Sequence, residues 1–317
     1  MNKTRHKAVR FCVDNIVWVL LILSIVIMGI LKPIFFTPRI LANILTQTTV
    51  LGIITVAMSM AILLGAINLS VVGTAAFSAA ISTSLMVNNG LHWTLSILLS
   101  ILIGLAIGWI NGMVIAKLKA VALIETLAMN MVLQGAVLAY TKGQTVTNYP
   151  DAYRMIGQGK IGEFPVLPIV LVVVYILFYI IWNYTAFGRS VFAVGGNEHS
   201  AYAAGINVDR IKIACFAIGG ALCGLAGFCL ASYMGAVTTS FGDSYEMSSI
   251  AASVIGGVSL TGGKGSIPGI LGGALLMTVI QVGLQILGIS SYYVTLCSGL
   301  MVFLAVLVDA MKNSISK

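Results

Sequence analysis

IVWVLLILSIVIMGIL (residues 16–31) and VLPIVLVVVYILFYIIW (residues 166–182) are apolar on every side of any helix they could form. A helix that crosses the ~30 Å hydrocarbon core of a membrane needs ~20 mostly apolar residues, because lipid offers no hydrogen-bond partner to an open backbone. A membrane-spanning β-strand would instead alternate apolar and polar residues over ~10 positions, and neither stretch alternates. The two stretches therefore predict an all-α integral membrane protein.

Apolar stretches of this kind continue from residue 16 to residue 309. Hydrophobic residues make up 59% of the 317 positions and charged residues 8%, whereas soluble proteins carry roughly 25% charged residues. The bilayer is therefore the solvent for most of the chain, which excludes a soluble domain held by one anchor. We expect a single transmembrane domain over residues 1–317.

Charged residues, prolines and Gly/Asn clusters divide the chain into about ten expected spans. Two of them, 69–87 and 248–261, are rich in Gly, Ser, Thr and Ala, so we expect them inside the bundle, broken or tilted, rather than facing lipid. The expected spans are 16–32, 44–64, 69–87, 93–116, 121–141, 165–184, 212–234, 248–261, 267–288 and 291–309.

The distribution of lysine and arginine predicts the orientation, because short loops that keep positive charge stay in the cytoplasm. With the basic N-terminus inside, twelve Lys and Arg residues fall on the inner side and five on the outer side. We therefore expect a multi-pass protein of the bacterial inner membrane with both termini cytoplasmic. The same bias accounts for much of the net charge of +8, so no nucleic-acid partner is needed to explain it.

Small residues recur at a spacing that lets helix backbones approach closely in lipid. We interpret these glycines as packing residues: Gly104, Gly108 and Gly112, Gly220 with Gly224, and Gly269 with Gly273. A separate echo links AILLGAINLS (61–70) to ASVIGGVSLT (252–261). Internal repeats are common in transporters, although a match of ten small and apolar residues also arises by chance.

The internal segment 185–211 is long enough to hold a short helix outside the membrane. Residues 198–204 have helix-compatible composition, with Asn197 before them as an N-cap and Gly205 after them as a C-cap. A short helix lying under the membrane is a natural docking surface for a cytoplasmic partner.

No group of residues in the sequence supports catalysis. The three histidines lie in different regions, and neither an H-E-x-x-H, a G-x-S-x-G nor a P-loop pattern occurs. We therefore expect a protein that is not an enzyme and binds no metal or cofactor, and any ATP must be bound by another chain.

Polar residues inside the spans are better clues, because each is costly in hydrocarbon unless it faces a cavity or a partner. Each could line a pathway or gate, or could instead join helices by hydrogen bonds. For Glu125 the alternative is an ion pair with Lys119 near the cytoplasmic surface. Neutral amides suit a neutral polyhydroxylated solute. The pathway candidates are Gln47, Asn68, Ser70, Glu125, Asn130 and Gln134.

Six stretches carry a resemblance to a known family. They are FFTPRILANILTQTT (35–49), LLGAINLSVVG (63–73), YTKGQTV (140–146), GRSVFAVGGNEHSAYAAGINVDRIK (188–212), SYEMSSIAASVIGGVSLTGGKGSIPGILGGAL (244–275) and SSYYVTLCSGLMVFLAVLVDA (290–310). Together they span nearly the whole chain and resemble the permease subunit of ribose-type ABC importers, which take up monosaccharides.

The resemblance implies a type II importer permease that works as a dimer with a second permease copy or a homologous permease. It would receive sugar from a substrate-binding protein and be driven by a separate ATPase subunit. The segment 188–212 then resembles the part that couples to the ATPase, with Gly188, Arg189, Gly195, Gly196, Asn197, Glu198, Ala203, Gly205 and Asn207 as the coupling residues. The residues near the usual Gly-Tyr-Glu-Leu setting, Asp243, Tyr245 and Glu246, are the expected contacts to the binding protein.

The chain also departs from the family pattern. Ala66-Ile67-Asn68-Leu69-Ser70 stands where the family usually has Gly-Ile-Asp-Leu-Ser, and Glu125 stands where it usually has an apolar or small residue. A nucleoside or a sugar-derived signalling molecule is therefore an alternative substrate. A secondary transporter acting alone is a more distant alternative, because only Glu125 and Glu246 are available in the spans for ion coupling.

Overall fold

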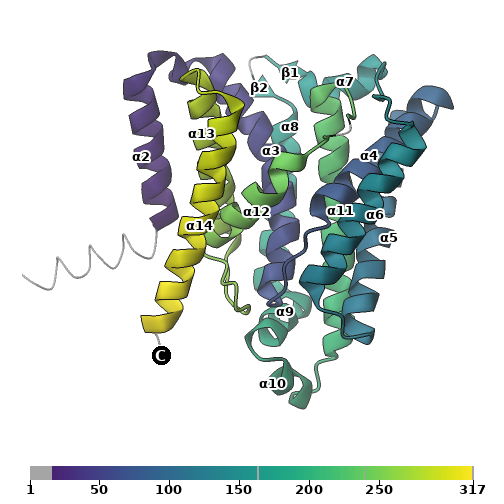
Figure 1. The fold of residues 1–317 in the computed structure, drawn as a ribbon, viewed down its shortest axis with the longest axis vertical. Coiled ribbons are helices and arrows are strands. Elements are labelled where there is room, and N and C mark those ends of the chain that lie inside the picture. Colours follow the sequence, from purple (N-terminus) through teal and green to yellow (C-terminus); the bar gives the residue numbers. More distant parts are fainter. Residues whose placement is uncertain (1–15, 163, 239, 316–317) are drawn as a thin grey trace, which may run out of the picture.

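The computed structural model describes residues 16–162, 164–238 and 240–315, and it is almost entirely helical (Figure 1). The basic residues of the N-terminus and Lys317, which entered the orientation prediction, lie outside the described residues. In chain order the helices are α2 (Ile16–Leu31), the 3₁₀ helix η1 (Pro33–Phe36), α3 (Pro38–Leu63), α4 (Val71–Asn88), α5 (Trp93–Lys117), α6 (Ala122–Thr141), α7 (Asp151–Gln158), α8 (Leu167–Tyr184), α9 (Ala186–Gly196), α10 (Glu198–Ala203), α11 (Val208–Met234), α12 (Asp243–Ile255), α13 (Ile267–Ile286) and α14 (Ser291–Ile315).

Seven helices of the described chain are long and apolar enough to cross a membrane: α3, α4, α5, α6, α8, α11 and α13. This confirms the predicted polytopic helical bundle. The segment 248–261 is broken inside the bundle, as expected, because the helix there ends at Ile255; its bounds differ from the prediction, since α12 covers the 13 residues Asp243–Ile255. At 1.5 Å per residue α12 is about 20 Å long, which is too short to cross ~30 Å of hydrocarbon.

The centre of the bundle is formed by α3, α4 and α11. More than two thirds of the most apolar window of α4 and of α11 is buried, and α3 is buried almost continuously from Thr46 to its end. In Figure 1, α2, α13 and α14 lie on one side of this centre and α5 and α6 on the other. The Gly/Ser/Thr/Ala-rich helix α4 is thus enclosed by its neighbours, as the sequence predicts.

The glycine spacing joins α5 to α11. A Cβ placed on Gly104 would collide with the carbonyl oxygen of Gly220, and a Cβ on Gly224 would collide with that of Ser100. The Ser100 hydroxyl donates to the Gly224 carbonyl at 2.8 Å. The two helices therefore pack backbone to backbone, which confirms the interpretation of these glycines as packing residues.

Two elements interrupt the regular helices inside the bundle. Residues 64–70 join α3 to α4, and residues 256–266 join α12 to α13. Gly65 and Gly263 adopt φ angles of +72° and +71°, which favour glycine. The first break lies within the echo segment 61–70, and the second begins within the echo segment 252–261 and continues to residue 266.

One end of the bundle carries α9 and α10, and α14 ends near it (Figure 1). The start of α2 points toward the same end but lies well short of it. The opposite end carries α7 and a two-stranded hairpin of β1 (Lys160–Ile161) and β2 (Phe164–Pro165), none of which the sequence predicts. There the Tyr153 hydroxyl donates to the Phe228 carbonyl at 2.9 Å, so α7 is fixed to α11.

Candidate functional site

A helical hairpin extends from one end of the bundle, and we call α9 and α10 the coupling hairpin (Figure 1). The predicted helix after Asn197 is confirmed: the Asn197 side chain accepts a hydrogen bond from the Ser200 amide at 2.8 Å. Gly205 follows the helix at φ +84°, as expected of a left-handed helix end. Helix α9 is not predicted, because Gly195 and Gly196 suggest a loop and are instead its last two residues.

Ion pairs tie the coupling hairpin and its surroundings to α11. The Lys212 ammonium lies 2.7 Å from the Glu198 carboxylate, which joins α11 to α10. Lys117 and Lys119 each lie 3.0 Å from the Asp209 carboxylate, which joins the turn after α5 to the start of α11. A groove of about 730 Å³ lies between the hairpin, the α5–α6 turn and the start of α11, and it is lined by Lys117, Lys119, Glu198 and Asp209 but not by Lys212.

The alternative interpretation of Glu125, an ion pair with Lys119, is wrong. Folding brings Asp209 to Lys119, although 90 residues separate them in the chain. Glu125 lies half-buried in the first turn of α6, and its Oε2 atom has no hydrogen-bond partner among the described residues. The other interpretation of Glu125, as a residue of the pathway or gate, therefore stays a prediction.

The predicted coupling residues fall into two groups. Gly188 is buried at the turn between α8 and α9, where its amide donates to Thr185 Oγ1, and Gly195 faces the bundle. The others are exposed on the hairpin or just after it: Arg189, Gly196, Asn197, Glu198, Ala203, Gly205 and Asn207. Asn207 also caps α11, because its side chain accepts from the Arg210 amide at 3.0 Å.

A cluster of polar side chains surrounds the start of α4 inside the bundle. Asn68 Oδ1 accepts from both the amide and the hydroxyl of Ser70, at 3.0 and 2.7 Å. Asn111 of α5, which the sequence analysis missed, donates to the same hydroxyl at 2.8 Å. Asn111 lies six residues before Lys117, the last residue of α5, which corresponds to about 9 Å along the helix. Because Asn111 contacts Ser70, α4 begins at this depth within the bundle.

A second part of this cluster joins three helices. Asn130 of α6 accepts from the amide of Gly73 in the first turn of α4 at 3.0 Å and faces Glu246 of α12 at 3.4 Å. Thr126, one turn earlier, accepts from the Leu69 amide at 3.0 Å. We define the central polar cluster as Asn68, Ser70, Asn111, Thr126, Asn130 and Glu246. Its side chains satisfy backbone groups that the break at 64–70 leaves open, as a membrane interior requires.

The other predicted site residues lie away from this cluster. Gln47 donates to Asn43 on α3 at 3.2 Å, and Tyr233 of α11 donates to the same Asn43 oxygen at 3.0 Å. Gln134 is exposed on α6, one turn beyond Asn130. At the start of α12, Asp243 is exposed and Tyr245 is half-buried, while Glu246 faces Asn130.

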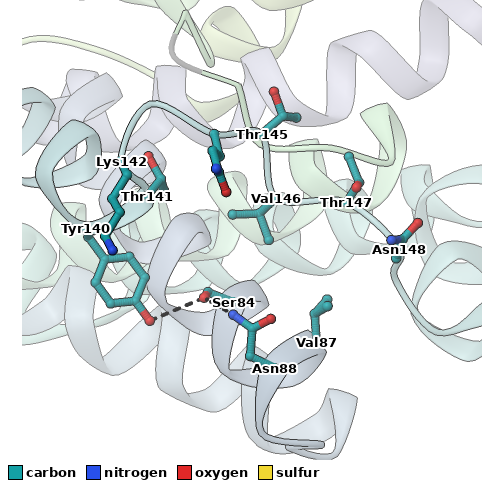
Figure 2. A pocket seen from close by; sticks show the side chains of 11 residues that line it. Ser84, Val87, Asn88, Tyr140, Thr141, Lys142, Thr145, Val146, Thr147 and Asn148 are labelled. Atoms are coloured by element: carbon teal, nitrogen blue, oxygen red, sulfur yellow. Dashed lines mark hydrogen bonds between the residues drawn. The ribbon is translucent and has the colours of Figure 1, made fainter.

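A polar pocket of about 500 Å³ opens at the end of the bundle opposite the coupling hairpin. Figure 2 shows Tyr140, Ser84 and Asn88 on its wall, where the Tyr140 and Asn88 side chains both donate to the Ser84 hydroxyl, at 3.3 and 3.0 Å. Residues 142–148 border the pocket, and Val146 pairs with Val237 at their centre. Burial raises the pKa of nearby Tyr149 to about 12, so its hydroxyl stays protonated.

Titratable side chains are sparse. Among residues 16–162, 164–238 and 240–315 no group of three His, Cys, Asp or Glu residues could hold a metal ion. The polar groups of the central cluster are mainly amides and hydroxyls that already bond to one another or to the backbone. Such an arrangement can hold and release a polar solute as helices move, but it has no paired acid and base for chemistry.

Apolar spans, helices interrupted inside the bundle and a helical hairpin at one end define a multi-pass membrane transport protein. Residues 40–306 match the family described as the permease component of branched-chain amino acid transport systems. The chain belongs to this permease family, and it is a transporter component rather than an enzyme.

Curated relatives extend over most of the chain. The ribose import permease protein of Bacillus subtilis (strain 168) is 38% identical over 296 residues, covering 93% of this chain and 92% of that protein. The ribose import permease protein of Escherichia coli (strain K12) is 36% identical over 297 residues, covering 92% of each chain. The L-arabinose ABC transporter permease protein of Azospirillum brasilense is 36% identical over 305 residues, covering 95% of this chain and 88% of its own. No solved structure matches the chain significantly.

Proposed function

We propose that the chain is the membrane-spanning subunit of an ATP-driven ABC importer that brings a monosaccharide, ribose or a related sugar, into the cell. The observation that carries the proposal is full-length similarity to permeases named for ribose and L-arabinose, together with a coupling hairpin at one end of the bundle. A separate ATPase subunit binds the nucleotide, and this chain binds no cofactor.

The sidedness of the proposal rests on the positive charges. Lys117, Lys119, Arg189, Arg210 and Lys212 lie at the end that carries the coupling hairpin. Since positive residues in short loops stay in the cytoplasm, this end faces the ATPase, and the end with α7 faces the substrate-binding protein. Both termini are then cytoplasmic, in the inner membrane.

The mechanism is a two-state gate. The ATPase docks on the exposed surface of α10, and closure of its nucleotide sites displaces the hairpin. Two permease copies, or this chain and a homologous permease, form the pathway between them. The permease forms and breaks no covalent bond, so its contribution is the difference in solute access between two conformations.

The central polar cluster is the proposed pathway lining. Amide and hydroxyl groups both donate and accept, which suits the hydroxyls of a neutral sugar. Glu125 and Gln134 extend this lining along α6, and Gln47 lies toward the outer end. Asp243, Tyr245 and Glu246 begin α12, where a sugar released by the binding protein would enter.

Reconstitution tests the function directly. The permease is placed in liposomes with its ATPase subunit, its binding protein and radiolabelled ribose. We expect uptake only when ATP is present on the side of the membrane where the ATPase lies. Unlabelled pentoses and hexoses should compete and nucleosides should not. Uptake by the permease without any ATPase would contradict the proposal, and competition by nucleosides alone would overturn the sugar assignment.

A further inference from the structure

Three backbone segments meet where the coupling hairpin joins the bundle. They are the last turn of α3 at Leu63, the end of α9 at Gly195, and the turn 261–264 between α12 and α13. The Gly263 amide donates to the Leu63 carbonyl at 2.9 Å. We call Leu63, Gly195 and Gly263 the junction.

The junction has no room for side chains between its backbones. A Cβ on Gly195 would fall on the Leu63 carbonyl oxygen, and a Cβ on Gly263 would lie 2.6 Å from the Cα of Gly196. A Cβ on the neighbouring Gly262 would lie 2.6 Å from the Gly195 carbonyl oxygen and 2.9 Å from the Gly65 amide nitrogen. Contacts between main-chain atoms cannot absorb a displacement by changing rotamers, so the three segments must move together.

Two of the three segments at the junction belong to the two helix breaks. Leu63 precedes residues 64–70, which carry Asn68 and Ser70 of the central polar cluster. Gly263 lies within residues 256–266, which end α12, the helix that carries Glu246. The hairpin therefore touches both elements that hold the central cluster.

This contact also gives a role to the sequence echo. Segment 61–70 begins in the last turn of α3, and segment 252–261 begins in the last turn of α12. Each segment then continues into the break that follows its helix. The first segment contacts Gly195 at Leu63. The second ends at Thr261, next to Gly262 and Gly263, which contact Gly195 and Gly196.

We propose that the junction transmits displacement of the coupling hairpin to both breaks at once, so that one push moves both elements that hold the central polar cluster. Gly195 is a positioning residue: it acts through Leu63 and Gly263 and touches neither nucleotide nor sugar. This inference rests on the proposed function, because it needs an ATPase that moves the hairpin.

Gly195→Ala tests the junction, and Gly135→Ala is its control. Gly135 lies in α6, away from the hairpin, and has nothing within 4 Å of an added Cβ, so the control adds the same methyl group to a helix where it meets no neighbour. In the reconstituted complex we expect Gly195→Ala to lower sugar-stimulated ATP hydrolysis and uptake about tenfold, with basal hydrolysis and co-purification of the ATPase retained. Gly135→Ala should match the wild type in all four measurements.

Hydrogen exchange on the wild-type complex gives a second test that does not depend on how a variant folds. The Gly263 amide should stay protected in both the nucleotide-free and the ATP-bound complex, because the junction moves as one unit. Rapid exchange in the peptide that contains it, in either state, would overturn the proposal.

The outcomes separate the two levels of the argument. A wild-type complex without ATP-driven uptake would remove the proposed function itself. A working wild type, with equal coupling in Gly195→Ala and Gly135→Ala, would leave that function intact and refute the junction alone.

Discussion

Replacing Asn130 with leucine removes the side chain that joins α6 to α4 and α12. Its oxygen accepts from the Gly73 amide at 3.0 Å, and its amide group faces the Glu246 carboxylate at 3.4 Å. A Cβ on Gly73 would collide with that oxygen, so the two residues fit each other closely. Asn130→Leu leaves a buried backbone donor without a partner.

The size of the effect follows from the burial of the two partners. Gly73 is buried, so its unpaired amide should cost about 1–3 kcal/mol, whereas Glu246 is only partly buried and can reach water. Hydrogen bonds between membrane helices average only ~0.6 kcal/mol, with a maximum near 1.7, which favours the lower part of that range. We expect Asn130→Leu to destabilise the detergent-solubilised protein by about 1–2 kcal/mol and to reduce uptake.

The measurement compares thermal unfolding midpoints and ATP-driven uptake with those of Gln134→Leu, an exposed amide on the same helix. Asn130→Asp should be more harmful, because it keeps the acceptor for Gly73 but sets two carboxylates together, with a repulsion of up to about 4 kcal/mol. Adding Glu246→Gln should restore the Asn130→Asp variant, since the amide and the carboxylate have then exchanged places. Equal midpoints for Asn130→Leu and Gln134→Leu, or no rescue in the double variant, would refute the hydrogen-bonded link.

Three further changes test other parts of the structure. Gly104→Leu should force α5 from α11 and destabilise the protein by at least about 2 kcal/mol, whereas Gly135→Leu, with open space around its Cβ, should change the unfolding midpoint little. Asn197→Ala should fray α10 at a cost of about 1 kcal/mol and weaken ATPase binding in a pull-down titration, whereas Asn197→Asp keeps the cap and should bind normally. Asp209→Asn breaks two exposed ion pairs and should lower stability by less than about 1 kcal/mol, and this difference should vanish in 1 M salt; a difference that persists would indicate a buried role.

Local signals explain what could be predicted from the sequence. The apolar spans, the enclosed position of α4 and the caps of α10 all follow from residues near one another in the chain. Asn197 and Gly205 bound α10 because capping uses groups within a few residues. The glycines of α5 and α11 indicate close packing for the same reason, although their spacing does not say that the two helices pack on each other.

Tertiary contacts explain what could not be predicted. Lys119 pairs with Asp209 rather than with Glu125, because the fold brings the start of α11 beside the α5–α6 turn. Asn111 joins the central cluster through Ser70, a contact across 41 residues that periodicity does not reveal. Gly195 is helical and not part of a loop, and it is glycine because only a residue without a side chain fits against Leu63.

The enclosure of α4 bears on how the protein is made. Its sequence, VVGTAAFSAAISTSLMVN, contains few large apolar side chains that could contact lipid. The helices that cover α4 include α5, α6 and α11, all of which are synthesised after it. Until residues from 208 onward have been synthesised, α4 lacks the cover of α11. Its small polar residues favour entry into hydrocarbon only weakly, so α4 is then only partly shielded. We therefore expect α4 to reach its final position in the membrane only when α11 has been inserted and packs against it.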